Sequence, residues 1–261
     1  MSLVGEAIER TAGPATLSTR FEIRAWAACA PGLHSQQDWL AWADAPYLPE
    51  GDAIPAVSAM APMVRRRLGS LGRATLHCAY GIRRADANTP LIFASRHGET
   101  TRIRPMLSDL AVGNPLSPTA FGLAVHNAIG ALYSIDRGDT GVMQAIAAGR
   151  DTVESSLVEA IGLLADGHEE VAVIVGEAPL DETYRDFVDE PECLYAWGWQ
   201  IGLPGSGAPV FSLTPCSPGR DGESPAASLP HGLEVLKFVL SGQRELLHRS
   251  DRLSWLWRRH D

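Results

Sequence analysis

Hydrophobic and polar residues follow a repeating strand–helix order along most of the chain. Polar and apolar residues alternate over 20–30, which is typical of a strand with one buried face. The apolar runs 90–95 and 171–175 predict strands that are covered on both faces. Apolar stripes at helical spacing predict helices over 62–82 and 99–112. Strands alternating with helices predict an α/β fold with parallel crossovers.

The segment 138–151, Gly-Asp-Thr-Gly-Val-Met-Gln-Ala-Ile-Ala-Ala-Gly-Arg-Asp, predicts a short strand that runs directly into a helix. Several enzymes place a nucleophile at such an elbow, because the helix N-terminus carries partial positive charge and free N–H groups. Here the bend holds Gly149 and Arg150, and an arginine has no electron pair with which to attack. Asp151 is predicted as the helix N-cap, with Glu154 completing a capping box. The sequence therefore predicts a catalytic scaffold without its nucleophile.

The C-terminal third has a different pattern. Segments 195–203 and 209–213 predict an antiparallel pair of strands joined by a Pro-Gly-Ser-Gly loop. The segment after them has the composition of a linker, and leucines at helical spacing follow it. The predicted organisation is a main domain, a flexible linker and a C-terminal amphipathic helix, at residues 1–214, 215–228 and 229–261.

Composition and charge exclude several classes of protein. The net charge is −9, and nucleic-acid binding needs a basic face for phosphate contacts. No apolar run approaches the ~18 residues of a membrane-spanning helix, and the N-terminal residues lack the apolar segment of a signal peptide. The four cysteines are far apart and form no CxxC pair, which predicts reduced thiols. We expect a cytoplasmic protein with no metal or other cofactor.

Two histidine motifs admit a catalytic interpretation. Arg96-His97-Gly98-Glu99 follows a predicted strand and matches the opening signature of histidine phosphatases, whose His accepts the phosphoryl group. The available second histidine, His231, lies beyond the predicted linker, so a structural or interface role is favoured. His126 has no nucleophile or carboxylate at motif spacing and is expected to be hydrogen-bonded at a helix start. A solvated loop, rather than a metal site, is expected for the acidic residues Glu177, Asp181 and Glu182.

A longer pattern resembles a known family. The block 117–130, from Ser-Pro-Thr-Ala-Phe to His-Asn-Ala-Ile-Gly, and the block 134–141, Ser-Ile-Asp-Arg-Gly-Asp-Thr-Gly, resemble the N-terminal half of a β-ketoacyl synthase. They resemble more closely the short ketosynthase-like chain-length factors found with aryl-polyene systems. The resemblance covers roughly residues 20–180 and includes the Arg-His-Gly-Glu element. It implies a thiolase-like α/β fold, with one ketosynthase half built as a layered mixed sheet with helices, and a C-terminal helical tail.

The resemblance also implies what the chain lacks. In a ketosynthase the segment after the Gly-x-x-Gly turn, here Gly138 to Gly141, ends in an element that carries the active-site cysteine. Gly149 and Arg150 fall in that region. The two catalytic histidines of the family belong to a C-terminal half to which the resemblance does not extend. The resemblance therefore implies a non-catalytic subunit that pairs with an active β-ketoacyl synthase, whose acyl chains arrive on an acyl carrier protein.

Dimers of this family pair through the strand before the elbow, which corresponds to 142–147. We expect this chain to bind the active synthase through that strand and to shape the tunnel for the growing acyl chain. The residues expected at the interface or tunnel wall are Phe121, His126, Asn127, Gly141, Val142, Met143, Gln144 and Ile146. Two alternatives stay open: a histidine-phosphatase-like hydrolase that uses Arg96 and His97, and an acyl-binding protein with its own pocket.

Overall fold

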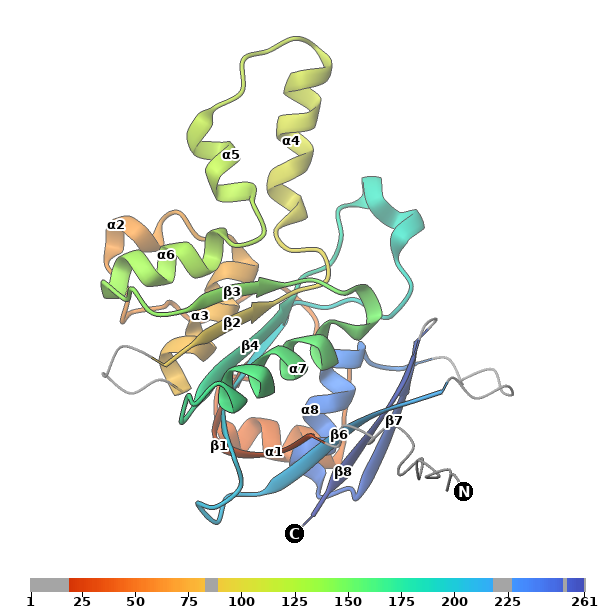
Figure 1. Ribbon diagram of the computed structural model, residues 1–261. Helices are drawn as coiled ribbons and strands as arrows, with labels where there is room; N and C mark the ends of the chain where they lie inside the picture. Colours follow the sequence, from red (N-terminus) through yellow and green to blue (C-terminus); the bar gives the residue numbers. More distant parts are fainter. Residues whose placement is uncertain (1–18, 83–88, 218–226, 251–252, 261) are drawn as a thin grey trace, which may run out of the picture.

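The computed structural model describes residues 19–82, 89–217, 227–250 and 253–260 (Figure 1). Within these residues, eight strands form one mixed sheet in the order β3-β2-β4-β5-β1-β6-β8-β7. The strands are β1 (Thr19–Cys29), β2 (Leu91–Ala94), β3 (Met143–Ile146), β4 (Val171–Glu177), β5 (Tyr195–Gly202), β6 (Val210–Cys216), β7 (Glu245–Arg249) and β8 (Ser254–Arg259). The α-helices are α1 (Gln36–Asp44), α2 (Pro62–Arg65), α3 (Ser70–Ile82), α4 (Thr100–Ala111), α5 (Pro118–Ala124), α6 (Ala128–Arg137), α7 (Thr152–Ala165) and α8 (His231–Ser241). Two short 3₁₀ segments are η1 (Gly149–Asp151) and η2 (Glu182–Phe187).

The sheet has a parallel part and an antiparallel part. β2 lies between β3 and β4 and is parallel to both, whereas the other strand pairs are antiparallel. β3, α7 and β4 thus form the strand–helix–strand unit that the sequence predicts. Among the described strands β3 pairs with β2 alone, so it is an edge of the sheet (Figure 1).

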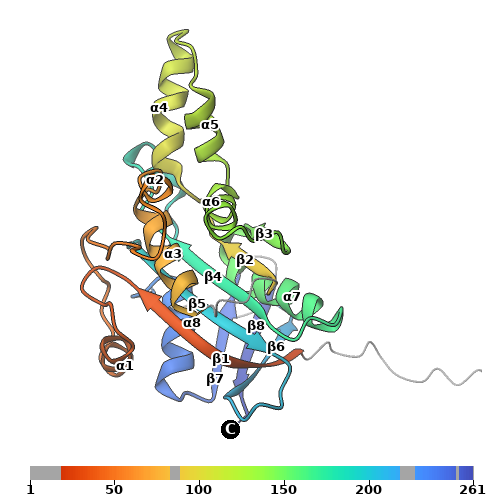
Figure 2. The same ribbon diagram turned by 90° about the vertical axis from the view of Figure 1, so that its left-hand side faces the viewer.

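Two helical layers bury the two faces of the sheet. Because side chains alternate along a strand, β4 sends Val171, Val173 and Val175 to one face and Ala172 and Ile174 to the other. The valine face packs with α1, α7 and α8, and the other face packs with α3 and α6 (Figure 2). The layered mixed sheet predicted from the sequence is confirmed. None of the helices in the described ranges has the length and apolarity needed to cross a bilayer.

The helix predicted over 62–82 is two helices. α2 ends at Arg65, and α3 begins at Ser70. The carboxylate of Glu99 lies at the break: its Oε1 accepts a hydrogen bond from Gly72 N at 3.2 Å. A Cβ on Gly69 would stand 2.5 Å from the same oxygen. A carboxylate from a distant segment therefore binds the first turn of α3, a contact that local periodicity does not reveal.

The two strands predicted as neighbours, 195–203 and 209–213, do not pair with each other. β5 and β6 each pair with β1, which lies between them. The side chain of Glu22 on β1 is buried and accepts hydrogen bonds from Gly205 N and Ser206 N, both at 2.9 Å. The loop between β5 and β6 therefore closes over the end of a third strand, and this pairing depends on a segment that is remote in sequence.

Glu22 supplies a test of this closure. Backbone hydrogen bonds from the loop and the Arg24 guanidinium outweigh burial and lower the pKa of Glu22 to about 2. Glu22→Gln is expected to reduce the free energy of unfolding at pH 7 by about 1.5–3 kcal/mol, because it removes charge-assisted hydrogen bonds. The stabilisation is present above the unfolded-state pKa near 4.5 and disappears as the pH falls toward 2. Urea unfolding should show that the difference in the free energy of unfolding between the wild type and Glu22→Gln is smaller at pH 3.5 than at pH 7. A difference that does not change with pH would contradict the lowered pKa of Glu22.

The C-terminal segment is not one helix over 229–261. α8 ends at Ser241, where Gly242 takes a left-handed conformation (φ 73°), and the hairpin β7–β8 follows. β8 pairs with β6, so the segment completes the main sheet, and the division at residue 214 is wrong. In the last strand Trp255 and Trp257 are buried, whereas Leu256 and Arg258 are more exposed, a period of two that is typical of a strand. Most of the predicted linker, residues 218–226, lies outside the described residues.

Candidate functional site

The predicted elbow between strand and helix is present. β3 is followed by η1, in which Gly149 has a φ of +59°, and α7 then begins at Thr152. The Thr152 hydroxyl holds the bend: it accepts from Ala148 N at 3.0 Å and donates to Gly149 O at 2.7 Å. A cavity of about 680 Å³ lies over the bend, lined among others by Arg150 and Trp255. The elbow therefore faces an open space large enough for a ligand.

The charges at this cavity are paired with carboxylates. Arg96 Nη2 lies 2.6 Å from Asp189 Oδ1, and Arg96 Nη1 lies 2.6 Å from Glu190 Oε1. Arg150 Nε lies 3.9 Å from Asp189 Oδ2. Arginine is protonated at all physiological pH values and cannot act as a nucleophile or general base. The cavity at the elbow is therefore lined by two arginines, Arg96 and Arg150, that form ion pairs with acidic side chains.

Three of the four cysteines are buried and poorly suited to act as nucleophiles. Burial raises the pKa of Cys29 and of Cys193 to about 12, and it raises the pKa of Cys78 well above the usual thiol value. A thiol with so high a pKa holds no useful thiolate at neutral pH. Cys216, on β6, is half-exposed. The cysteines are free, as the sequence predicts.

The capping box predicted at the start of α7 is not formed. Asp151 is the N-cap residue, but its carboxylate caps no backbone N–H of the helix. Instead it accepts from Ser250 Oγ at 2.8 Å and from Trp255 Nε1 at 3.1 Å. Glu154 points into the core, away from the cap. Both acids are therefore engaged by the C-terminal segment, which sequence spacing within the helix does not show.

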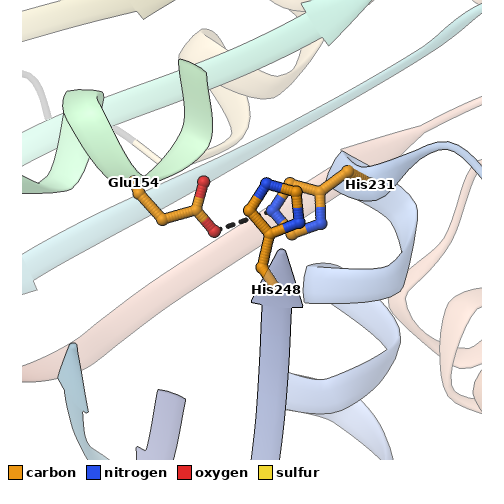
Figure 3. Close-up of side chains that lie close together, drawn as sticks. All are labelled: Glu154, His231 and His248. Atoms are coloured by element: carbon orange, nitrogen blue, oxygen red, sulfur yellow. Dashed lines mark hydrogen bonds and ion pairs between the residues drawn. The ribbon is translucent and has the colours of Figure 1, made fainter. Parts of the chain in front are cut away.

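Glu154, His231 and His248 form a cluster that the sequence analysis missed (Figure 3). His231 Nε2 lies 2.7 Å from Glu154 Oε1, and the two imidazole rings are stacked with centroids 3.5 Å apart. Burial lowers the pKa of His248 to about 4. The three residues come from α7, α8 and β7, so their distances in the sequence follow no motif spacing. Only the packing of the C-terminal segment brings them together.

The Arg96-His97 motif does not have the arrangement of a phosphatase site. Both terminal nitrogens of Arg96 are engaged by carboxylates, which leaves its charge compensated. Burial, together with Arg96, lowers the pKa of His97. His231, its suggested partner, is hydrogen-bonded to Glu154 and stacked on His248. These contacts speak against phosphate binding and phosphoryl transfer at His97.

The acidic residues after β4 do not form one solvated loop. Glu177 is buried and accepts from Arg96 N at 2.5 Å and from Ser95 Oγ at 3.1 Å. Burial outweighs these hydrogen bonds and raises the pKa of Glu177 to about 8. Asp181 pairs with Arg104, whereas Glu182 is exposed. The prediction is wrong for Glu177, which holds the end of β2 to the end of β4.

Four of the predicted interface residues lie at the edge strand. Val142 precedes β3, and Met143, Gln144 and Ile146 belong to it. The side chain of Gln144 donates to Glu159 Oε1 of α7 at 2.8 Å. Val142 is exposed, and the other three are half-buried. These residues form a continuous strip at one end of the sheet.

The other predicted interface residues lie around α5 and α6. His126 Nε2 donates to Ser95 O at 2.9 Å, which is the hydrogen bond expected near a helix start, and Asn127 is the N-cap of α6. Gly141 N donates to Asp139 Oδ1 in the turn before β3. Phe121 lies on α5 with 60% of its surface exposed, on the projection that α4 and α5 form above the sheet (Figure 1). The structure thus places Phe121 on α5, His126 and Asn127 in the connection to α6, and Gly141 in the turn before the edge strand.

Comparison with known proteins decides the family. The profile of the family described as "Beta-ketoacyl synthase, N-terminal domain" matches residues 39–258, most of the chain. The chain belongs to this family. It has a ketosynthase-like, thiolase-type fold comprising one ketosynthase half, as the sequence predicts. A search of curated protein sequences finds no significant match.

Solved structures agree with this assignment. The chain is similar, with 28% identity and a TM-score of 0.79, to a chain in the complex of a ketosynthase (ApeO) with its chain length factor (ApeC) from Xenorhabdus doucetiae; the match covers 92% of this chain and 99% of that one. The ishigamide ketosynthase/chain length factor shares the fold at 13% identity and a TM-score of 0.62, over 77% of this chain and 68% of that one. A β-ketoacyl synthase from Burkholderia phymatum STM815 shares it at 13% identity and a TM-score of 0.53, over 80% and 67%.

Proposed function

We propose that this ketosynthase-like subunit is non-catalytic and acts as a chain-length factor: it pairs with an active β-ketoacyl synthase and shapes the tunnel for the growing acyl chain. The observation that carries the proposal is the elbow. The structure has the bend, the helix N-terminus and a cavity beside them, with Gly149 and Arg150 at the bend, and the sequence resemblance puts the nucleophile of a ketosynthase in this region. Neither Gly149 nor Arg150 carries a thiol or hydroxyl, and the neighbouring Thr152 hydroxyl is hydrogen-bonded to the backbone of the bend, so in the proposed role no acyl-enzyme forms at this position.

The similarity to the ApeO–ApeC complex supports a partner. The match covers nearly all of both chains, so the similar chain in that complex has about the same length as this one. That complex is described as a ketosynthase bound to its chain length factor. By this likeness the partner of the present chain is an active synthase. The sequence resemblance adds that acyl chains reach the pair on an acyl carrier protein and that the product class is that of aryl polyenes.

The open edge at β3 supports a means of pairing. Leu91 N donates to Val142 O, and Ser95 N donates to Ile146 O. Backbone groups of alternate residues point to opposite sides of a strand, so those of Met143 and Ala145 point away from β2. A second strand beside β3 would satisfy them and extend the sheet across two subunits.

Exposed apolar side chains near this edge support a large interface. Val142 beside β3, Ile135 on α6 and Val158 on α7 are 43%, 70% and 46% exposed. The projection of α4 and α5 adds further large apolar side chains that are well exposed, namely Leu107, Leu110, Val112, Leu116, Phe121 and Val125. Apolar surface of this extent marks an interaction site. In the proposed heterodimer, Phe121, His126 and Met143 contribute to the wall shared with the partner's tunnel.

Co-expression with the synthase from the same cells tests the proposal. A stable 1:1 complex is expected by light scattering, and carrier-bound acyl chains should elongate with the pair but not with this chain alone. Malonyl-dependent condensation by the purified wild-type chain without a synthase would refute the non-catalytic role, and failure to form any complex would refute the pairing.

A further inference from the structure

The strongest unassigned feature of the molecule is the cluster of Glu154, His231 and His248. Glu154 lies in the first turn of α7, His231 opens α8, and His248 is on β7. One ligand atom from each residue lies within 4.8 Å of the other two. Figure 3 shows the carboxylate directed toward the two imidazoles. Two imidazoles and a carboxylate are a ligand set that divalent transition metals prefer.

The carboxylate has an unsatisfied atom in this cluster. Glu154 is fully buried, and its Oε1 accepts from His231 Nε2 at 2.7 Å and from Trp257 Nε1 at 3.0 Å. Its Oε2 has no hydrogen-bond partner among the described residues. A buried carboxylate oxygen without a partner is costly. A cation in the cluster would remove that cost, so this oxygen is an observation independent of the ligand count.

The hydrogen bond of His248 fixes its tautomer for metal binding. His248 Nε2 lies 3.0 Å from Arg150 O, and a carbonyl oxygen only accepts, so Nε2 carries the proton. The other ring nitrogen, Nδ1, therefore keeps its lone pair. Metal-binding histidines commonly donate their second ring N–H to a backbone carbonyl in this way, which orients the ring. The neighbouring ring of His231 is stacked nearly parallel to it, with 18° between the planes.

The cluster is accessible from an adjoining cavity of about 400 Å³. His231 and His248 line this cavity together with Arg150, Glu190 and Glu234. The side chains of the two histidines are 13% and 8% exposed. An ion therefore has a route to the cluster, and the cavity has room for the water molecule that completes a four-coordinate site.

We propose that Glu154, His231 and His248 bind one divalent transition-metal ion, with Zn²⁺ as the best-matched ion and water as the fourth ligand. Ligand atoms about 2.1 Å from a tetrahedral zinc lie roughly 3.4 Å from one another. Because the lone pairs of stacked rings lie in parallel planes, one imidazole must rotate out of the stack for both to reach the ion. On binding, His231 Nε2 gives up its proton: an imidazolium releases it to solvent and keeps Nδ1–H, whereas a neutral ring moves it to Nδ1, so that a neutral imidazole binds the ion in either case. The ion would tie α8 and β7 to the helix that follows the elbow.

Isothermal titration of the untagged, EDTA-treated full chain with ZnCl₂ tests the site. We expect one ion per chain, and at least about tenfold weaker binding in Glu154→Gln, His231→Gln and His248→Gln. His34→Gln is the matched control, because His34 is exposed and lies on a different part of the chain. Equal zinc affinity in the wild type and the three variants would overturn the proposal. So would absence of binding to the wild type at about 100 µM zinc, a concentration far above the dissociation constants typical of structural zinc sites.

A second measurement needs no variant and so does not depend on variants folding. Zn²⁺ is expected to protect His231 and His248 of the wild-type chain from modification by diethyl pyrocarbonate, while His34 is modified equally with and without the metal. Mass spectrometry of peptides gives the position of each modification. Unchanged modification of both cluster histidines at saturating zinc would overturn the proposal.

Discussion

Ala145→Pro is expected to abolish assembly with the synthase while leaving this chain folded. The amide of Ala145 points away from β2, as inferred from the hydrogen bonds of Leu91 N and Ser95 N to β3. Proline there removes an outward N–H and places its ring where a partner strand would lie. We expect the dissociation constant of the pair to rise by roughly a hundredfold or more. Surface plasmon resonance with the immobilised synthase measures this change.

Two matched variants separate loss of pairing from loss of folding. Ala145→Ser keeps the outward N–H and should bind as the wild type does. Gln144→Pro removes an N–H that points toward β2, so it should lower the melting temperature of the isolated chain, whereas Ala145→Pro should change it little. If Ala145→Pro bound the synthase with wild-type affinity, pairing through β3 would be refuted.

Glu177→Gln is expected to stabilise the protein above neutral pH and to remove a pH dependence. The pKa of Glu177 is about 8 in the folded chain and near 4.5 in the unfolded chain, because the folded state buries the carboxyl group. Between these values the folded chain holds one more proton. Its free energy of unfolding therefore falls as the pH rises, by up to about 1.4 kcal/mol per pH unit. This contribution is complete below about pH 4.5 and is lost as the pH rises through 8.

Urea unfolding at pH 5, 6.5 and 8 tests this expectation. The variant and the wild type should differ little at pH 5, and the variant should be the more stable by several kcal/mol at pH 8. His248, with a pKa lowered to about 4, gives an opposite slope at acidic pH, but it is present in both proteins and cancels in their difference. Glu182→Gln is the control, since Glu182 is 81% exposed. If the free energies of unfolding of the wild type and Glu177→Gln changed with pH in the same way, the raised pKa of Glu177 would be contradicted.

The candidate site divides into a part that sequence reasoning found and a part that it missed. The elbow was predicted because the strand, the bend and the helix are contiguous in 138–151, and local sequence governs each of them. The cluster of Glu154, His231 and His248 was missed because its members are separated by 77 and 17 positions and carry no motif. Only the return of the chain through α8 and β7 brings the two histidines to α7.

By itself the sequence determined the types of the buried elements and the family. Apolar runs such as 171–175 predict covered strands, and the blocks between 117 and 141 identify the ketosynthase resemblance, because both signals lie within short stretches. The tertiary structure alone decided that β1 separates β5 from β6, that the last residues form a hairpin in the same sheet, and that Glu177 is buried. Strand pairing and desolvation depend on which distant segments meet. Which segments meet depends on the free energy of the whole packed core, and a local sequence pattern does not contain that information.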